Sequence, residues 1–348
     1  MPTPASAGRG RWGSGGQALG AFADYGGGME DQLGAASAFL NADADASASA
    51  VAARWPELRV DSWEGARVTL HMYTQVVGKV RMALTPMLNH WWQVPLYVSA
   101  RGLTTGPIPY EGELFEIEFD LLTHRLSMVR SDGREASFAL GDQPVAAFYA
   151  SLMEALDSLG VVVSIHGRPN EVDPAVPFAD DVEHCHYDPR AVGLFWRQLI
   201  QAQRVLTVFR SEFTGKSSPV HLFWGALDLA VTRFSGRVAP EHPGGVPNCP
   251  DRVMVEGYSH EISSAGFWPG GGAEGAFYSY AYPAPPGFAA APVPAGAHYD
   301  AGLGEFLLPY ETVRAAPDPD ALVLEFLRAT ASAAATLGHW DEAAPAAP

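Results

Sequence analysis

An aspartate inside an apolar segment is the first residue of this sequence that could do chemistry. Asp228 lies in the run PVHLFWGALDLAVTRF, residues 219–234, which is apolar on both faces when it is read as a β-strand. A carboxylate buried in such a strand must pair with a cation, bind a metal ion or take up a proton. Asp228 is therefore a candidate catalytic residue, and a core ion pair with an arginine of a neighbouring element is the competing interpretation.

Three other residues of the same predicted strand could contribute to a site. His221 and Arg233 lie near its two ends, and strict alternation places them on one face and Asp228 on the other. We predict Arg233 as a catalytic residue, His221 as a metal ligand and Trp224 as a ligand-binding residue. Ordinary packing in a sheet is the alternative for each of them.

A second cluster of polar residues lies in the segment GYSHEISSAGFWPGGG. His260 and Glu261 are adjacent in a probable strand and point to opposite faces, and no second histidine follows at the helical spacing of a zinc protease. We predict Glu261 as catalytic, His260 as a metal ligand and Tyr258 as a ligand-binding residue. Hydrogen-bonded sheet residues would give the same pattern. The glycines that follow Trp268 could let the backbone approach a ligand closely.

The segment EHCHYDPR offers a further pair of nitrogen ligands. His184 and His186 have the spacing of metal ligands on an extended chain, and we retain His184 as a metal ligand. The segment directly precedes a predicted helix, where a capping side chain is equally expected. With His221 and His260, this residue completes a nitrogen set that would suit zinc or iron.

Two periodic stripes can be explained either by a site or by packing. Tyr280 belongs to a period-two stripe of tyrosines, residues 278–282, that lines a pocket or packs a sheet face. We predict Tyr280 as a ligand-binding residue. Arg67, His71, Gln75 and Lys79 follow one side of a predicted helix, and such stripes are usually solvated. His71 and Gln75 would be unusual only if this helix were covered on both sides.

Composition limits the partners of the protein. The 348 residues carry a formal net charge of -17, which argues against binding to nucleic acid or to an anionic membrane surface. No apolar run is long enough to cross a bilayer. The two cysteines cannot form a disulfide scaffold, so we expect a reducing, cytoplasmic location. Signatures of nucleotide-binding loops, nucleophile elbows and zinc proteases are absent from the sequence.

The elements that must position these residues predict an α+β fold made of two similar halves. Each half is an antiparallel sheet flanked by helices, and the halves pack as one unit. An Ala, Gly and Ser-rich tail is expected to be disordered, and a Pro and Asp-rich segment reads as a linker. The predicted boundaries are residues 1–50 for the tail, 55–167 and 189–340 for the two halves, 168–188 for the linker and 341–348 for a frayed end.

The two halves share a loose local pattern. His90 and His221 each begin an apolar segment that leads to an arginine, Arg101 or Arg233, and then to a turn that contains glycine and proline. The spacings differ by one residue, which a β-bulge could absorb. An internal duplication predicts this pattern, and so does any pair of helix–sheet–helix units.

Six motifs of the ordered region carry a family resemblance: WPEL, TLHMYTQVVGKVR, NHWWQVPLYVSARGLTT, KSSPVHLFWGALDLAVTRFSGR, GYSHEISSAGFWPGGG and FYSYAYP. At these motifs the chain resembles a bacterial family that is catalogued only as a domain of unknown function. The resemblance covers about residues 55–340. It implies one continuous unit and no particular activity. The family pattern fits His184 better than His186, which lowers His186 as a metal ligand.

Two classes of function follow from the sequence. The first is an enzyme that acts on a small molecule, with a divalent metal ion held by His, Asp and Glu residues of the second half. The second is a non-catalytic protein that binds a small ligand or acts as a scaffold, with the ligand in an apolar pocket between aromatic sheets and helices. The substrate, the reaction and the oligomeric state stay open at this level.

Overall fold

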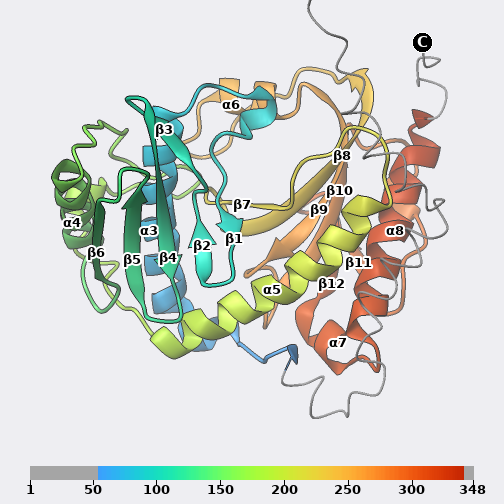
Figure 1. Ribbon diagram of the computed structural model, residues 1–348. Helices are drawn as coiled ribbons and strands as arrows, with labels where there is room; N and C mark the ends of the chain where they lie inside the picture. Colours follow the sequence, from blue (N-terminus) through green and yellow to red (C-terminus); the bar gives the residue numbers. More distant parts are fainter. Residues whose placement is uncertain (1–53, 341–348) are drawn as a thin grey trace, which may run out of the picture. The chain divides into compact units, whose positions relative to one another are not determined.

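The structure, a computed structural model, describes residues 54–340 of the chain. The predicted tail, residues 1–50, and the predicted frayed end, residues 341–348, lie outside the described residues. The described chain is α+β, with two antiparallel sheets of six strands each and flanking helices, as the sequence predicts (Figure 1). No helix within this described part is long and apolar enough to cross a membrane.

The first half consists of a sheet that packs against two helices. The strands follow the order β1-β2-β4-β5-β6, and β3 pairs with the start of β4 on the same edge as β2. The stacked rings of Tyr73 and Phe148, with centroids 3.9 Å apart, join the two helices. The elements are α3 (Val60–Leu84), the short 3-10 helix η1 (Asn89–Trp91), β1 (Tyr97–Val98), β2 (Gly102–Thr104), β3 (Ile108–Tyr110), β4 (Glu113–Asp120), β5 (Arg125–Arg130), β6 (Glu135–Ala139) and α4 (Val145–Ser158).

Strand β4 shows how alternation sets the two faces of the first sheet. Phe115, Ile117 and Phe119 are buried, whereas Glu116 and Glu118 between them are partly exposed. Apolar side chains at every second position bury one face of a strand and leave the other face wet. The segment ELFEIEFD therefore forms a half-buried strand with an acidic face.

The second half contains the other sheet, in the order β11-β12-β10-β9-β8-β7. Helices α5 and α8 both contact this sheet and each other, and Figure 1 shows α5 running diagonally across the molecule. The elements are η2 (Phe178–Asp180), α5 (Pro189–Ser211), β7 (His221–Phe223), β8 (Asp228–Val238), α6 (Asp251–Gly257), β9 (His260–Trp268), β10 (Ala276–Tyr282), η3 (Phe288–Ala290), β11 (His298–Asp300), β12 (Glu305–Pro309), α7 (Tyr310–Ala315) and α8 (Pro319–Leu337).

The two long helices of the second half begin in the same way. Asp188 precedes α5 and accepts a hydrogen bond from the Arg190 amide at 2.9 Å, and Asp318 precedes α8 and accepts one from the Ala321 amide at 3.0 Å. Both helices carry proline at the first turn, where its missing N–H leaves no hydrogen bond unmade. The capping side chain expected just before helix α5 is Asp188.

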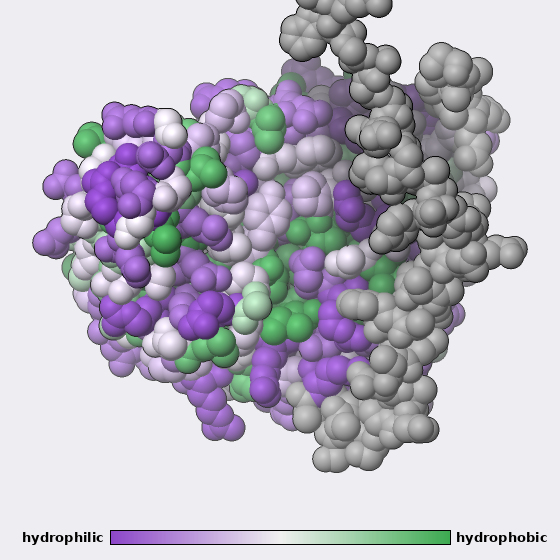
Figure 2. Space-filling model, viewed as in Figure 1, coloured by the Kyte–Doolittle hydropathy of each residue, from purple (hydrophilic) through white to green (hydrophobic). Residues whose placement is uncertain are grey.

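The two sheets meet at their edges. The backbone N–H groups of Leu96 and Leu222 each donate to the carbonyl of the other residue, at 2.9 Å and 2.8 Å. This bridge joins the chain just before β1 to strand β7. Figure 2 shows apolar side chains, in green, gathered near the middle of the viewed face, whereas the surface over α4 and the first sheet is mostly polar.

Two segments whose apolar residues would fit a strand, 161–167 and 252–263, have a different structure. Residues 252–263 contain helix α6 and only the first residues of β9. Residues 161–167 form no strand, because the Val161 amide donates to a carbonyl of the preceding helix and the Val162 amide donates to the Tyr110 hydroxyl. An apolar run alone does not distinguish a strand from a short helix or from a chain held by side chains.

Candidate functional site

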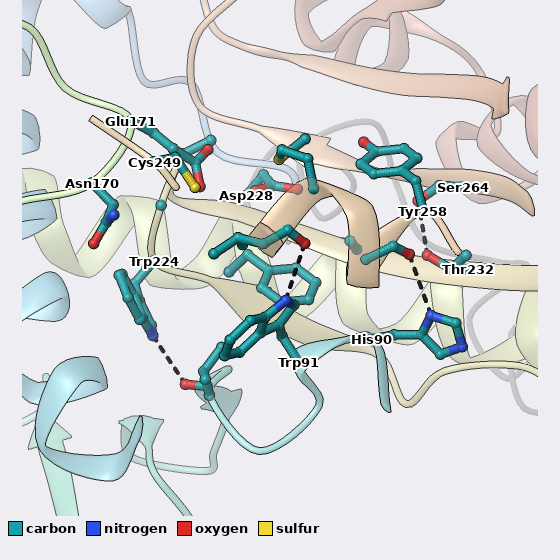
Figure 3. A pocket seen from close by; sticks show the side chains of 18 of the residues that line it. His90, Trp91, Asn170, Glu171, Trp224, Asp228, Thr232, Cys249, Tyr258 and Ser264 are labelled. Atoms are coloured by element: carbon teal, nitrogen blue, oxygen red, sulfur yellow. Dashed lines mark hydrogen bonds between the residues drawn. The ribbon is translucent and has the colours of Figure 1, made fainter. Parts of the chain in front are cut away.

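A cavity of about 650 Å³ lies over one face of the second sheet. Strands β8, β9, β10 and β12 supply its floor, and loops from both halves supply its walls (Figure 3). A cavity of this size with aromatic walls and a few convergent polar groups is typical of a small-molecule site. Its aromatic lining consists of Trp91, Trp92, Phe223, Trp224, Phe234, Tyr258, Trp268, Tyr278 and Tyr280.

A glycine at the centre of the floor lets one tyrosine lie across a strand. Ala230 on β8 pairs with Gly266 on β9, and Gly266 pairs with Tyr278 on β10. A Cβ atom at Gly266 would lie 2.6 Å from the Tyr278 hydroxyl oxygen, so no larger residue fits under this ring. The hydroxyl donates to Oδ2 of Asp228 at 2.5 Å. A side chain from two strands away therefore fixes the carboxyl of Asp228.

Asp228 lies at the beginning of a strand and not in the middle of one. The predicted strand 219–234 is a hairpin, since β7 ends at Phe223 and β8 starts at Asp228. Leu227 has φ +61°, and a Cβ atom at Gly225 would lie 2.1 Å from Oε1 of Glu171. The hydrophobic pattern did not show this turn because three of its four residues, Trp-Gly-Ala-Leu, are apolar. The correction moves Asp228 from a closed core to the floor of the cavity.

Trp224 separates the cavity from helix α3. Its indole N–H donates to the Val94 carbonyl at 3.0 Å. Gly78, in the middle of α3, makes room for the ring, because a Cβ atom there would lie 2.1 Å from the indole nitrogen. Glycine costs about 1 kcal/mol relative to alanine in a helix interior. Its presence in α3 is therefore explained by the position of Trp224.

Helix α3 also holds the loop that carries Glu171. The Gln75 amide group exchanges two hydrogen bonds with the backbone of Asn170, at 2.7 Å and 2.9 Å. The Lys79 ammonium donates to the Asn170 side-chain oxygen, and the Asn170 side-chain NH₂ donates to the Asn248 carbonyl at 2.8 Å. Lys79 is only 1% exposed, and burial lowers its pKa to about 8. Four hydrogen bonds thus fix the position of Asn170.

The third polar residue of this stripe fixes the hairpin turn. Nε2 of His71 lies 2.9 Å from the carbonyl oxygens of Trp224 and Gly225, so its N–H donates to both. Burial lowers the pKa of His71 to about 4, which keeps the ring neutral near pH 7. Since Gln75 is also completely buried, helix α3 is covered on both sides. The sequence does not decide whether this polar side of α3 is solvated or covered. The structure shows that it holds the segments that line the cavity.

Glu171 lies beside Cys249 at one end of the cavity (Figure 3). Its surface area is that of an exposed residue because it borders the cavity, yet protein surrounds its carboxyl on most sides. This desolvation, with a smaller contribution from the charge of Asp228, raises the pKa of Glu171 to about 7. Burial and the charge of Glu171 raise the pKa of the Cys249 thiol to about 11.

Two further carboxyls on the floor of the cavity are also shifted. Burial raises the pKa of Asp228 to about 6, although the hydrogen bond from Tyr278 opposes the shift. Glu305, at the start of β12, has a pKa of about 7 because of burial and the charges of Asp228 and Asp300. Within residues 54–340, Glu171, Asp228 and Glu305 form no ion pair. The cavity thus holds three carboxyls that change protonation near neutral pH.

Backbone strain gathers around the same cavity. Eight non-glycine residues of the described chain have positive φ angles, and five of them line the cavity or precede Asp228. Such conformations cost on the order of 1 kcal/mol each and are typical of functional sites, where the surrounding structure holds them in place. The five residues are His90 (φ +57°), Trp91 (+60°), Glu171 (+61°), Leu227 (+61°) and Asn248 (+51°).

A histidine and a lysine lie at the far end of the cavity from Glu171. The Lys216 ammonium donates to Nε2 of His90 at 2.8 Å, and Nδ1–H of His90 donates to the Gly257 carbonyl at 3.3 Å. Burial and the neighbouring charge of Lys216 lower the pKa of His90. This neutral ring forms part of the wall (Figure 3).

The structure brings four of the nine predicted site residues to the cavity. Asp228 and Tyr280 lie on its floor, and Trp224 and Tyr258 lie on its walls. The Tyr258 and Tyr280 hydroxyls are 2.9 Å apart and hydrogen-bonded. The competing interpretation of Asp228, an ion pair with a core arginine, does not describe its surroundings.

The other predicted catalytic residues lie elsewhere. Arg233 faces the opposite side of the sheet, where it donates to the Phe209 carbonyl and stacks 3.6 Å from the Phe209 ring centroid. Glu261 pairs with Arg237 at 2.7 Å, beside a smaller cavity of about 330 Å³. Strand alternation accounts for both positions, because each residue has the opposite parity to those that line the main cavity.

The three predicted metal ligands are not brought together. His221 is completely buried, with its ring packed against Phe223, and burial lowers its pKa to about 3. His260 lies 5.5 Å from the ring of His90, whereas His184 binds Asp181 at 2.8 Å. Among residues 54–340, no three His, Cys, Asp or Glu side chains are placed to hold one metal ion.

Several cavity residues escape prediction from sequence. Glu171 and Asn170 lie in the segment 168–188, whose Pro and Asp content indicates only a linker. The sequence does contain a signal for Glu305, because it is a lone acid at the start of the apolar strand EFLLP. Lys79 belongs to the polar stripe along one side of the predicted helix, but only the packing of α3 shows that it is buried.

Comparison with known proteins identifies a family whose activity is not known. The profile of a family described as "Family of unknown function (DUF5996)" matches residues 55–347. Neither the curated proteins nor the solved structures contain a significant match to this chain.

Proposed function

The chain belongs to the family of unknown function DUF5996, and we propose from the cavity itself that the protein is an enzyme that acts on a small molecule by proton transfer. The observation that carries this proposal is the set of three carboxyls, Glu171, Asp228 and Glu305, which titrate between about pH 6 and pH 7 in an aromatic cavity. Acids and bases with pKa values near the working pH transfer protons most effectively.

The environments of the carboxyls support different roles. The hydrogen bond from Tyr278 favours the ionised form of Asp228, which has the lowest pKa of the three. Glu171, whose pKa is about 7, is populated in both forms at neutral pH. Neighbouring carboxyls that differ in this way are typical of a proton donor beside a charged partner. We assign proton transfer to Glu171 and the role of its charged partner to Asp228.

The chain holds Glu171 in position independently of the ligand. Asn170, the preceding residue, is fixed by Gln75, Lys79 and the carbonyl of Asn248, and Glu171 itself packs against Gly225. A catalytic group is most effective when packing and hydrogen bonds fix its orientation. Trp224 and the loop 248–258 form walls of the same cavity.

Conversion of metabolites tests the proposal. The full-length protein is incubated with a cell metabolite extract, and mass spectrometry follows compounds that disappear and compounds that form. We expect the wild type to convert at least one metabolite, and Glu171→Gln to lower that rate at least about 100-fold because the amide cannot transfer the proton. Glu135→Gln, at an exposed position on β6, is the matched control and keeps the wild-type rate.

The second candidate function is non-catalytic ligand binding. The aromatic lining and the volume of the cavity support it, because binding requires no acid or base. The same experiment separates the two candidates. A metabolite that is retained by the protein but never converted, in wild type and Glu171→Gln alike, would leave binding as the function and remove the enzyme.

Two subsidiary expectations accompany the proposal. The expected zinc or iron ion has no converging ligand set among residues 54–340, and metal analysis of protein purified without an affinity tag tests this version. A cytoplasmic location is supported by the two free cysteines, Cys185 and Cys249.

A further inference from the structure

We propose that the ligand of this cavity carries a protonated amine on an apolar or aromatic body, and that the ammonium group is held between the carboxylate of Asp228 and the aromatic rings beside it. This inference rests on the proposed function only in taking the cavity as the ligand site. It adds the chemical class of the ligand, which the proton-transfer chemistry does not specify.

The aromatic walls are the first reason to expect a cation. Phe223 on β7 pairs directly with Asp228 on β8, and both side chains face the cavity. Leu229 pairs with Phe267, so the next residue on β9, Trp268, lies on the other side of Asp228. Ring faces carry partial negative charge and attract ammonium groups, and the attraction grows when water is excluded. The strand register therefore places an aromatic residue on each side of Asp228, and all three residues line the cavity.

The charge of the floor is the second reason. Asp228 accepts a hydrogen bond from Tyr278, and none of Asp228, Glu171 and Glu305 has a cationic partner within the described residues. An ionised carboxylate that is withdrawn from water needs a compensating charge. An ammonium ligand supplies that charge and donates hydrogen bonds to the carboxylate oxygens.

The cations of the protein do not occupy this position. Lys79 donates a hydrogen bond to Asn170 and lies 5.3 Å from the ring centroid of Trp224, and Lys216 donates a hydrogen bond to His90. Arg252 also lines the cavity, but it forms no ion pair with the three carboxyls. The structure thus holds its own positive groups apart from Asp228 and leaves that carboxylate facing the cavity.

Matched amine and alcohol probes test the inference. Binding of 2-phenylethylamine and of 2-phenylethanol to the full-length protein is measured by calorimetry at neutral pH. The two molecules share the same body and differ in the charge of one group. We expect the amine to bind at least about 10-fold more tightly than the alcohol.

Two carboxamide variants locate the effect. Asp228→Asn keeps the shape of the side chain and the acceptor for Tyr278, and we expect it to weaken amine binding about 10-fold while alcohol binding changes less than about 2-fold. Glu135→Gln leaves both affinities unchanged. Circular dichroism confirms that the variants fold. Glu305→Gln is the second test variant if Asp228→Asn does not fold, and we expect it to weaken amine binding about 3-fold.

Three results would overturn the inference. These are equal affinities for the two probes, an amine affinity that Asp228→Asn does not change, and no binding of the amine at about 10 mM. None of them affects the conversion experiment with Glu171→Gln. Conversion of an uncharged metabolite would keep the proposed enzyme and remove the amine, whereas selective amine binding without conversion would do the reverse.

Discussion

The acids of strand β4 and the acids that line the cavity have opposite surroundings. In β4 each acid has a hydrogen-bond donor: Ser99 donates to Glu118 at 2.6 Å, Arg101 donates to Asp120 at 3.0 Å, Thr104 donates to Glu116, and Ser131 donates to Glu113. On the cavity face of the second sheet Asp228 accepts a side-chain hydrogen bond from Tyr278, and neither Asp228 nor Glu305 forms an ion pair among the described residues. The opposite face of the same sheet carries a paired acid, Glu261 with Arg237.

The difference separates structure from function in a fold made of two similar halves. The acids of β4 already have hydrogen-bonding partners; Glu116 and Glu118 are partly exposed, and Asp120 is buried beside Arg101. Asp228 and Glu305 face the aromatic cavity, where burial favours the protonated form. Similar strands therefore carry acids that stabilise the fold in one half and acids that are free to act on a ligand in the other.

The largest effect is expected at the contact between the halves, where Trp224 of the second half packs on Gly78 of α3. Gly78→Ala places a methyl group 2.1 Å from the indole nitrogen, and we expect a loss of about 2–3 kcal/mol in the free energy of unfolding, with the tryptophan displaced from the wall. Thermal and urea unfolding measure this change.

Gly193→Ala in α5 is the matched control. No atom lies within 4 Å of its Cβ position, so the helix preference of alanine should stabilise the protein by up to about 1 kcal/mol. Equal stabilisation by both substitutions would mean that Trp224 does not pack on α3 in solution.

The next largest effect contrasts one aspartate from each sheet. Asp228 has an ordinary pKa of 3.8 that burial raises to about 6 in the folded state. Between these values the folded protein binds more protons than the unfolded one, so this group lowers stability as the pH rises. Asp228→Asn removes the effect, and its stability relative to wild type should increase by about 1–2 kcal/mol between about pH 4 and pH 8.

Asp120→Asn should behave in the opposite way. Burial opposes ionisation of Asp120, but hydrogen bonds from Arg101 and the 122–123 backbone outweigh it and hold the pKa below 3.8. The stability that this group contributes is present above pH 3.8 and is lost as the pH falls through the lower folded value. The variant should therefore lose about 0.5 kcal/mol relative to wild type as the pH rises from about 3 to 7. Equal signs for the two variants would remove the distinction between the sheets.

Part of this contrast can be predicted from the sequence and part cannot. The alternation of β4 fixes the wet face of the first sheet, and the caps at Asp188 and Asp318 fix the beginnings of two helices, because these signals are local. The cavity joins α3, the segment around Asn170, a hairpin turn and the loop 248–258, which are distant in the sequence. Asp228 was singled out by its apolar neighbours, whereas Glu171 depends on contacts that no local pattern records.

A smaller effect is expected in the reactivity of the two thiols. Cys185 is exposed, whereas Cys249 lies beside Glu171 and has its pKa raised by burial to about 11. Because the thiolate is the reactive form, iodoacetamide should modify Cys249 at least about 10-fold more slowly than Cys185. Peptide mass spectrometry after timed alkylation measures both rates, and faster modification of Cys249 would show that the cavity is open to water.

The smallest effect is expected from the floor tyrosine. Tyr278→Phe removes the donor that favours the ionised form of Asp228, so the pKa of Asp228 should rise further, by about one unit. Affinity for 2-phenylethylamine at neutral pH should fall about 2-fold as the ionised fraction decreases. A variant with unchanged affinity would exclude the hydroxyl from the positioning of this carboxylate.

Carboxyl ¹³C NMR of the full-length protein is the most direct test of the contrast between the sheets, with Asp228→Asn and Asp120→Asn used to assign the two signals. The structure predicts that Asp228 titrates at about 6 and that Asp120 titrates below 3.8. A titration of Asp228 at its ordinary value of 3.8 would contradict the account. The carboxylate would then be solvated by water and would need no charged ligand as a partner.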